Sequence, residues 1–202
     1  MNKRHIHHFW TRIRPVSYWY FFVGFAICSI IFVFAYRHNN LRALELRDQL
    51  LQVDKANGDV ETTLKELRGF TYAHMNANLA GGQNSIYPPI QLQYTYERLV
   101  QIEQARVATA QKDIMAQATS YCARAVPENG PGTNRIPCIT QYIQGNSVKE
   151  QDIPDALYKF DFIAPVWSPD MAGWSLVLGL IFLLLGVVRF LLEKWLKHTL
   201  KH

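Results

Sequence analysis

The stretch VSYWYFFVGFAICSIIFVFAY fills residues 16–36 without a charged side chain. A second apolar stretch, MAGWSLVLGLIFLLLGVV, fills residues 171–188, and apolar residues continue beyond the single Arg189. At about 1.5 Å per residue, a helix of either length crosses a hydrocarbon core about 30 Å thick and satisfies its own backbone hydrogen bonds there. These two stretches decide the fold, because they predict transmembrane helices at 16–36 and 171–192.

The average composition of the chain hides this pattern. Its 202 residues are 49% hydrophobic and 18% charged, which is ordinary for a globular protein. The net charge of +5 is unevenly distributed, with +4 in residues 1–15, +3 in residues 189–202 and −2 in residues 37–170. We therefore interpret the basic charge as a property of the two flanks, and we expect no nucleic-acid partner.

The basic flanks also predict an orientation. Short segments rich in Lys and Arg stay in the cytoplasm, because they cross the membrane poorly and attract anionic lipid head groups. We expect a two-pass protein of the plasma membrane, with cytoplasmic tails at 1–15 and 193–202 and an extracytoplasmic domain at 37–170. A cleaved signal peptide is the competing interpretation, but the apolar run is long and Phe34-Ala35-Tyr36-Arg37 lacks a small-x-small cleavage site.

The cysteines fit an oxidising outer compartment. Cys122 and Cys138 both lie in the predicted outer domain, and the stretch between them is rich in Pro, Gly and Asn, which indicates a loop. This pairing predicts a disulfide bond, which would contribute about 3 kcal/mol in the chain-entropy model. The alternative is a pair of free, half-buried thiols.

Residues 46–78 carry a stripe of mostly apolar side chains with alternating spacings of four and three. This pattern predicts a helix that packs along its length on other helices. The triplet Asn57-Gly58-Asp59 interrupts it, since Gly58 suits a left-handed helix stop and Asp59 suits an N-cap. Two interpretations stay open here: a helix-turn-helix, which we favour, or one continuous rod with a polar core position.

A second outer helix is predicted over about 92–125, where an alanine-rich face allows a neighbouring helix to approach closely. A short third helix is predicted after Pro137, with Gly145 as its stop. Residues 153–170 contain three prolines and cannot form a continuous helix, whereas residues 36–55 contain no Pro or Gly. The expected fold is an all-α membrane protein in which two transmembrane helices, the first continuing stiffly outward, flank an extracytoplasmic helical bundle.

Small residues recur along both predicted spans and allow close contact between helices, within one chain or between subunits. Arg189 is expected to reach the inner head groups with its guanidinium rather than to act inside the membrane. The residues predicted to pack the transmembrane helices are Gly24, Cys28, Ala172, Ser175, Gly179 and Gly186.

The sequence offers little chemistry. Tyr72, His74 and Asn78 lie where the first outer stripe turns polar, and they form a candidate ligand pocket, with a polar bundle tip as the alternative. The histidines within residues 5–8 lack the carboxylate or Cys ligands that would complete a metal site. No nucleophile elbow, paired-carboxylate motif or phosphate-binding loop occurs, so we expect no enzyme, no catalytic residues and no cofactor.

The stretches VDKANGDVE (53–61), YPPIQL (87–92) and IPDALYKFDF (153–162) carry a family resemblance. They resemble a group of uncharacterised two-span membrane proteins of ultrasmall, Saccharibacteria-like bacteria. The resemblance implies a bacterial plasma membrane and brings no activity with it. In layout the chain also resembles the sensory half of a bacterial chemoreceptor, but no signalling coiled coil follows the second span.

These observations favour a membrane-anchored, non-enzymatic interaction or assembly protein with an extracytoplasmic helical domain. Its expected partners are the lipid bilayer and either further copies of itself or another envelope or membrane protein. The alternative is a ligand-sensing or regulatory subunit that acts through a partner membrane protein. An apolar pocket near His74 with convergent polar groups would favour the alternative, whereas an exposed apolar ridge would favour the interaction protein.

Overall fold

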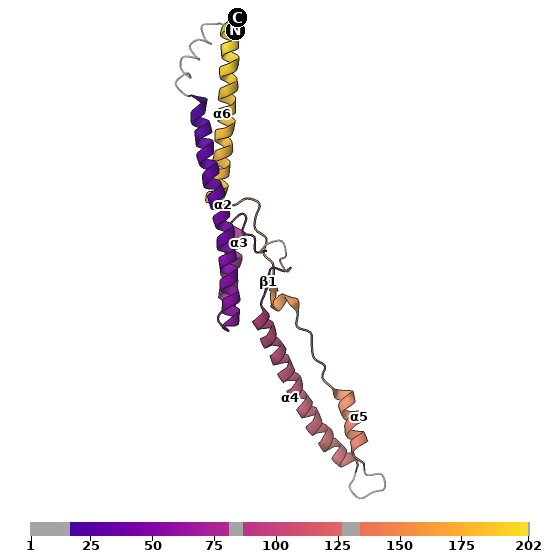
Figure 1. Cartoon of the computed structure of the whole chain (residues 1–202). Helices are drawn as coiled ribbons and strands as arrows, with labels where there is room; N and C mark the ends of the chain where they lie inside the picture. The colour runs from indigo at the N-terminus through magenta and orange to yellow at the C-terminus, as the bar shows by residue number, and fades with distance from the viewer. Residues whose placement is uncertain (1–16, 81–86, 127–133, 202) are drawn as a thin grey trace. The chain divides into compact units, whose positions relative to one another are not determined.

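The computed structural model of the chain, drawn in Figure 1, describes residues 17–80, 87–126 and 134–201. Most of these residues are helical. The chain forms two compact units, and each is described separately. The first consists of Met1–Val53, Asp59–Pro89 and Asp161–His202, and the second of Asp54–Gly58 and Ile90–Phe160.

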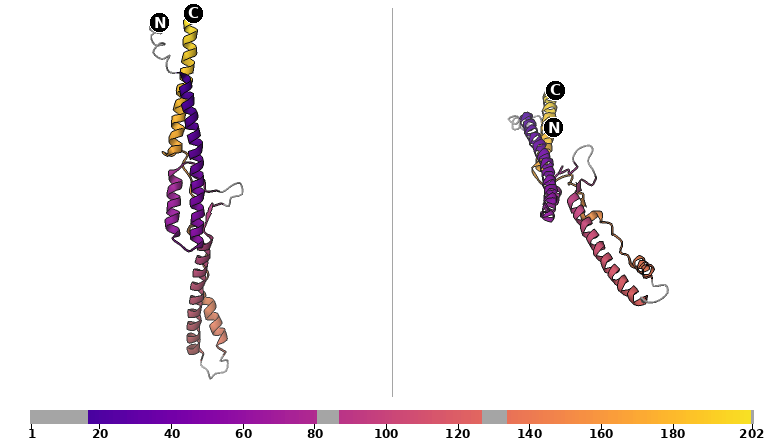
Figure 2. Two further views of the ribbon diagram at one scale, coloured as in Figure 1. Left: turned by 60° about the vertical axis from the view of Figure 1, so that its left-hand side comes forward. Right: turned by 60° about the horizontal axis from the view of Figure 1, so that its bottom comes forward.

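Two long helices contain the apolar stretches. Helix α2 (Tyr18–Lys55) runs without a break through the first stretch and into the polar sequence after it, which confirms the predicted stiff continuation. Helix α6 (Met171–Lys201) contains the second stretch. Both helices are long and apolar enough to cross a membrane. Figures 1 and 2 show the two helices side by side along their apolar parts.

The chain turns between α2 and helix α3 (Val60–Ala73). Asn57, the residue before Gly58, adopts a left-handed conformation with φ 55°, so an Asn takes a left-handed position in this turn. The Asp59 carboxylate caps α3 by accepting hydrogen bonds from the backbone N–H of Thr62 at 3.1 Å and from its hydroxyl at 2.6 Å. The helix-turn-helix prediction is therefore confirmed, and the single continuous rod is wrong.

Helix α3 lies along the C-terminal half of α2 (Figure 2). The buried residues of these helices recur at helical spacing, and the segment that follows α3 adds further buried side chains. Each fully buried Leu contributes roughly 1.5–3 kcal/mol relative to an exposed one. The buried apolar residues are Ala43, Leu46 and Leu50 of α2, Leu67 of α3, and Met75, Ala77 and Leu79 after it.

In the second unit, helix α4 (Gln93–Ala125) is followed by helix α5 (Ile136–Asn146), which returns alongside the C-terminal part of α4. Both helices agree with the predicted ones to within a residue or two. The chain after α5, residues 147–160, is called the return segment. It contains a short 3-10 helix, η1 (Asp155–Leu157), and strand β2 (Lys159–Phe160). Strand β2 pairs antiparallel with strand β1 (Ile90–Gln91). This two-residue ladder was not predicted and is a small departure from an all-α fold.

Candidate functional site

A buried polar cluster lies in the first unit, just beyond the apolar part of α2 and just before α6. The side-chain amide of Asn39 donates to the Asp170 carboxylate at 2.6 Å and to the Met75 carbonyl oxygen at 3.2 Å. The Ser168 hydroxyl accepts from the backbone N–H of Met75 at 2.8 Å. Because Asn39 and Ser168 are buried, these bonds satisfy groups that would otherwise be costly to desolvate. The cluster joins three segments that are far apart in the sequence.

Asp170 also caps α6. Its carboxylate accepts from the backbone N–H of Gly173 at 2.8 Å, in the manner of an N-cap. Burial raises the pKa of Asp170, but hydrogen bonds from Gly173, Asn39 and Ser168 outweigh this effect and leave the pKa below its ordinary value. His74 lowers the pKa of Asp170 further through its charge. Asp170 is therefore a carboxylate at neutral pH.

A groove of about 710 Å³ lies beside this cluster, and we call it the α2 groove. Its wall is apolar and its end is polar. Two of the apolar side chains, Ile30 and Phe34, are 58% and 72% exposed, so the groove is open to its surroundings. The apolar lining is Ile30, Ile31, Phe34, Ala35 and Met171, and the polar lining is His38, Asn39, His74 and Asp170.

His74 is held in place at the polar end of the α2 groove. Its ring stacks on Phe70 with centroids 4.1 Å apart, and its Nδ1 lies 3.0 Å from the carbonyl oxygen of Phe70. A carbonyl oxygen only accepts hydrogen bonds, so Nδ1 carries a proton and donates it. The Nε2 nitrogen of His74 is then the one available to a ligand.

The structure places the three residues of the predicted pocket in different surroundings. His74 lines the α2 groove, whereas Asn78 lines a second pocket of about 310 Å³ together with Tyr87 and Asp161. Tyr72 contacts the ring of Phe162 edge-on at 6.0 Å, and it lines neither of these two pockets. The polar partners of His74 are instead residues that sequence reasoning missed. Asn39 and Asp170 carry no local signal of burial, because nothing near them in the sequence reveals what covers them.

The small residues of the two apolar helices lie where α2 and α6 approach each other. A Cβ atom added to Gly179 would lie 3.4 Å from the Cβ of Cys28, and one added to Gly24 would lie 3.3 Å from the Phe182 ring. At Gly186 the nearest atoms, at 3.3 Å, belong to Phe21 and Phe22. Contacts this close require small residues. The other two predicted packing residues, Ala172 and Ser175, are both buried.

Arg189 lies further along α6. It is 8% exposed, and its guanidinium lies 4.0 Å from the Glu193 carboxylate. The predicted contact of Arg189 with lipid head groups stays a prediction.

The second unit contains a buried carboxylate that the sequence does not single out. Asp54 is 1% exposed and accepts hydrogen bonds from the backbone N–H of Tyr94 at 3.0 Å and from the Thr95 hydroxyl at 2.6 Å. The Arg98 guanidinium forms an ion pair with the Asp54 carboxylate, with the nitrogen and oxygen atoms 2.9 Å apart. All three partners lie in the first turns of α4, where a negative charge is favourable. Asp54 therefore has a structural role, and its partners account for its burial.

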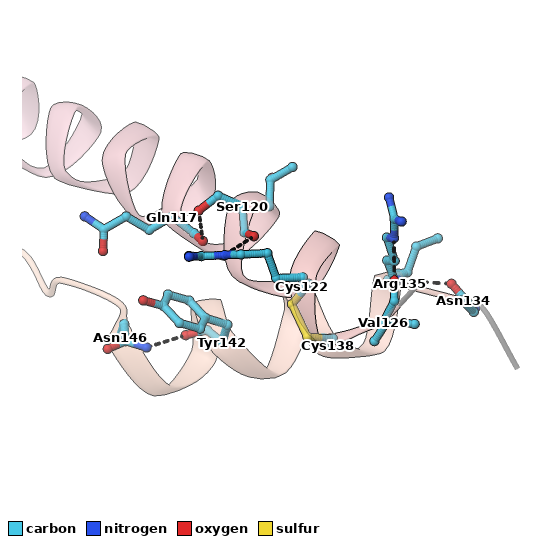
Figure 3. The surroundings of a disulfide bond; sticks show 12 residues. Gln117, Ser120, Cys122, Val126, Asn134, Arg135, Cys138, Tyr142 and Asn146 are labelled. Carbon is cyan, nitrogen blue, oxygen red and sulfur yellow. Dashed lines mark hydrogen bonds between the residues drawn. A yellow bond between two sulfur atoms is a disulfide. The ribbon is translucent and has the colours of Figure 1, made fainter. Parts of the chain in front are cut away.

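Figure 3 shows the disulfide bond between Cys122 of α4 and Cys138 of α5. The predicted pairing is confirmed, with Cα atoms 6.0 Å apart, and the alternative of two free thiols is wrong. Beside it the rings of Tyr121 and Tyr142 lie 5.4 Å apart.

One side of α4 is covered and the other is exposed. Ala118 and Cys122 are buried on the side where α5 lies. Most of the remaining surface of α4 is exposed, and beside the covered side a row of exposed residues recurs at alternating spacings of three and four, which is the spacing of a helix–helix contact. Met115 is 49% exposed there, beside a depression of about 480 Å³ that includes Ala108. We call this row the α4 seam, and it consists of Ala105, Ala108, Lys112, Met115, Ala116 and Thr119.

Glu103 ties α4 to the return segment. Its carboxylate accepts from the Arg106 guanidinium at 2.6 Å and from the backbone N–H of Gln151 at 2.8 Å. These bonds, together with the positive charge of Arg106, lower the pKa of Glu103 to about 2. The hydrogen bond between Glu103 and Gln151 holds the return segment against α4.

Among the residues that the structure describes, no group of three or more His, Cys, Asp or Glu side chains could hold a metal ion. The histidines at 5–8 lie outside the described residues. In comparisons with known proteins, the chain matches no protein-family model, no curated protein and no solved structure.

Proposed function

We propose that the chain is a membrane-anchored, non-enzymatic interaction or assembly protein of a bacterial plasma membrane. Helices α2 and α6 would span the bilayer, with both termini in the cytoplasm and residues 37–170 outside it. The length and apolar character of the two helices support the anchoring, and the basic flanks support the orientation. The disulfide bond supports an oxidising outer compartment for α4 and α5.

The observation that carries this proposal is the exposed α4 seam. Alanines and a threonine on one side of a helix allow the backbone of a second helix to approach closely. Met115 adds an adaptable apolar side chain, 49% exposed, to this surface. A partner helix on the α4 seam would bury it.

Lys112 restricts the choice of partner. It lies in the middle of the α4 seam and is exposed. A helix that packs on the seam must either present a carboxylate to this ammonium group or leave it at a solvated edge, because an unpaired buried charge is costly. A small-residue helix with an acidic group, in a second copy or in another envelope or membrane protein, meets this requirement.

Photo-crosslinking in native membranes tests the proposal. A photoreactive phenylalanine analogue in place of Ala108 on the α4 seam should capture a partner at high yield. The matched control is the same analogue in place of Asp113, which is also exposed but lies about 140° around the helix. Equal capture at both positions, or none at Ala108, would contradict the proposal. Capture of the same chain would identify a homo-oligomer, and capture of another protein would identify a hetero-partner.

A second candidate function is a ligand-sensing or regulatory subunit, and the α2 groove favours it. The groove brings His38, Asn39, His74 and Asp170 together next to an apolar wall. Helix α2 continues without a break from this groove through the apolar stretch. A shift of α2 on ligand binding could therefore pass along one rigid element to a partner membrane protein.

A further inference from the structure

The α2 groove changes from apolar to polar along a single face of one helix. Ile30, Phe34 and His38 are spaced by four residues, so their side chains follow one another on the same side of α2. From Ile30 to His38 the helix rises about 12 Å. Over that short distance the lining passes from aliphatic and aromatic carbon to imidazole, amide and carboxylate groups.

The position of the groove indicates what surrounds it. Its apolar wall belongs to the last part of the stretch that is apolar enough to cross a membrane, and its polar end follows directly. If α2 spans a bilayer, the groove crosses the boundary between acyl chains and head groups. Its open mouth then faces lipid, which is present there at a far higher concentration than any soluble ligand.

The charges at the polar end match a zwitterionic head group. Asp170 is a carboxylate that accepts from Asn39, Gly173 and Ser168 and retains about one acceptor position, because a carboxylate offers about four lone-pair positions. An ammonium group with N–H donors can use that capacity. The imidazole of His38 can donate to a phosphate oxygen, and His74 can donate from Nε2 in its imidazolium form, in which both ring nitrogens carry a proton.

We propose that the α2 groove binds one phospholipid whose head group carries a primary ammonium, that is, a phosphatidylethanolamine. The ammonium lies at Asp170, the phosphate lies at His38 and His74, and an acyl chain follows Ile30 and Phe34. A choline head group has no N–H to donate to Asp170, and a glycerol head group has no positive charge. This inference rests on the proposed two-span insertion and does not depend on the α4 seam.

Native mass spectrometry of the full-length protein tests the proposal. The protein, purified in detergent, is mixed separately with a phosphatidylethanolamine, a phosphatidylcholine and a phosphatidylglycerol of identical acyl chains. We expect one phosphatidylethanolamine per chain to be retained with an affinity roughly fivefold to tenfold above the other two, as the loss of one charge-assisted hydrogen bond predicts. Equal retention of the three lipids would overturn the proposal.

Two variants and a control locate the bound lipid. Ala35→Phe fills the groove and should abolish the retained lipid, whereas the control Leu184→Phe adds a ring at an exposed position of α6 that does not line the groove. His38→Glu places a negative charge beside the phosphate, at an exposed position, and should lower the affinity for phosphatidylethanolamine about tenfold. The His38→Glu variant still tests the lipid site if the Ala35→Phe variant fails to fold. Unchanged binding in His38→Glu, or equal loss in the Ala35 and Leu184 variants, would overturn the assignment to the groove.

Alkaline carbonate extraction separates this failure from a failure of the proposed insertion. A chain that stays in the membrane pellet but retains no lipid overturns the lipid site alone. A chain that is released into the supernatant overturns the two-span insertion and the lipid site with it.

Discussion

A Cβ atom at Gly173 would lie 1.7 Å from the carbonyl oxygen of Ser168. The chain therefore passes over the start of α6 at a distance that only glycine permits, since the obstructing atom belongs to the backbone and cannot rotate away. The same close approach brings the Gly173 N–H within 2.8 Å of the Asp170 carboxylate. Gly173 thus allows the contact that joins α6 to the buried polar cluster.

Gly173→Ala is expected to destabilise the protein by about 3 kcal/mol or more, because the backbone of Ser168 must move and the cap at Asp170 is lost. Thermal unfolding in detergent measures this effect. Gly69→Ala is the matched control, because nothing lies within 4 Å of a Cβ atom added there. The control should gain about 0.5–1 kcal/mol from the higher helix propensity of Ala. Similar unfolding temperatures for the two variants would contradict the prediction.

Asp54→Ala is expected to destabilise the second unit by about 3 kcal/mol, because it leaves Arg98 and two donors at the start of α4 without their acceptor. Hydrogen exchange of the Tyr94 amide should accelerate accordingly. Asp48→Ala removes an ion pair whose carboxylate is 61% exposed and should cost less than about 0.5 kcal/mol. In a double-mutant cycle, Arg98→Ala should cost much less when Asp54 is already absent, and strictly additive losses would argue against the pairing.

The disulfide should protect both of its cysteines from thiol reagents in intact cells. In a Cys28→Ala background, which leaves only Cys122 and Cys138, labelling is expected only after reduction. Labelling before reduction would show that the bond is not formed in the cell. The Cys122→Ser, Cys138→Ser double variant should lose about 3 kcal/mol of stability, as expected for a closed loop of this length.

The contact of Glu103 with Arg106 and Gln151 should make stability depend on pH in the acid range. The pKa of Glu103 is lowered from its ordinary value of 4.5 to about 2 by these partners. Since the folded pKa lies below the unfolded one, the contact stabilises the fold fully above about pH 4.5 and loses its effect as the pH falls toward 2. The carboxyl carbon shift of Glu103, followed by NMR, should report this midpoint.

The matched control for the acid transition is Glu97→Gln, which alters an exposed carboxylate on the same helix. Glu103→Gln should flatten the fall in thermal midpoint between pH 4.5 and 2, whereas Glu97→Gln should leave it in place. A Glu103 midpoint near 4 would count against the contact.

Protease accessibility should reveal the orientation. Added outside intact cells, a protease is expected to cut between Glu128 and Arg135, in the stretch rich in Pro and Gly, and to spare tags on both termini. The basic flanks predict this result because they hold both ends in the cytoplasm. Removal of a C-terminal tag under the same conditions would reverse the proposed orientation.

Several elements could be predicted because their causes are local. The turn at Asp59 follows from a capping side chain next to a Gly, and the length of α2 follows from the absence of Pro and Gly after Tyr36. The disulfide followed from counting cysteines in one compartment. The β1–β2 ladder was missed, because two-residue strands are too short to show an alternating pattern.

The polar residues of the α2 groove could not be predicted as a group. Tyr72, His74 and Asn78 are close in the sequence, yet the structure separates them, because the end of α3 and the extended segment after it direct their side chains differently. Asn39 and Asp170 are 131 positions apart, and their hydrogen bond exists only because α2 and the start of α6 meet. No pattern in either neighbourhood indicates this contact.

The sequence by itself determined that the chain is helical, that two helices are apolar enough to cross a membrane, and where most helices begin and end. Helical hydrogen bonds and apolar stretches depend on residues within a few positions of one another. Only the tertiary structure decided that Asp54 is buried, that Gly173 meets Ser168, and that one side of α4 stays uncovered. Burial depends on what packs over a residue, and the partners that cover Asp54 lie at least 40 positions further along the chain.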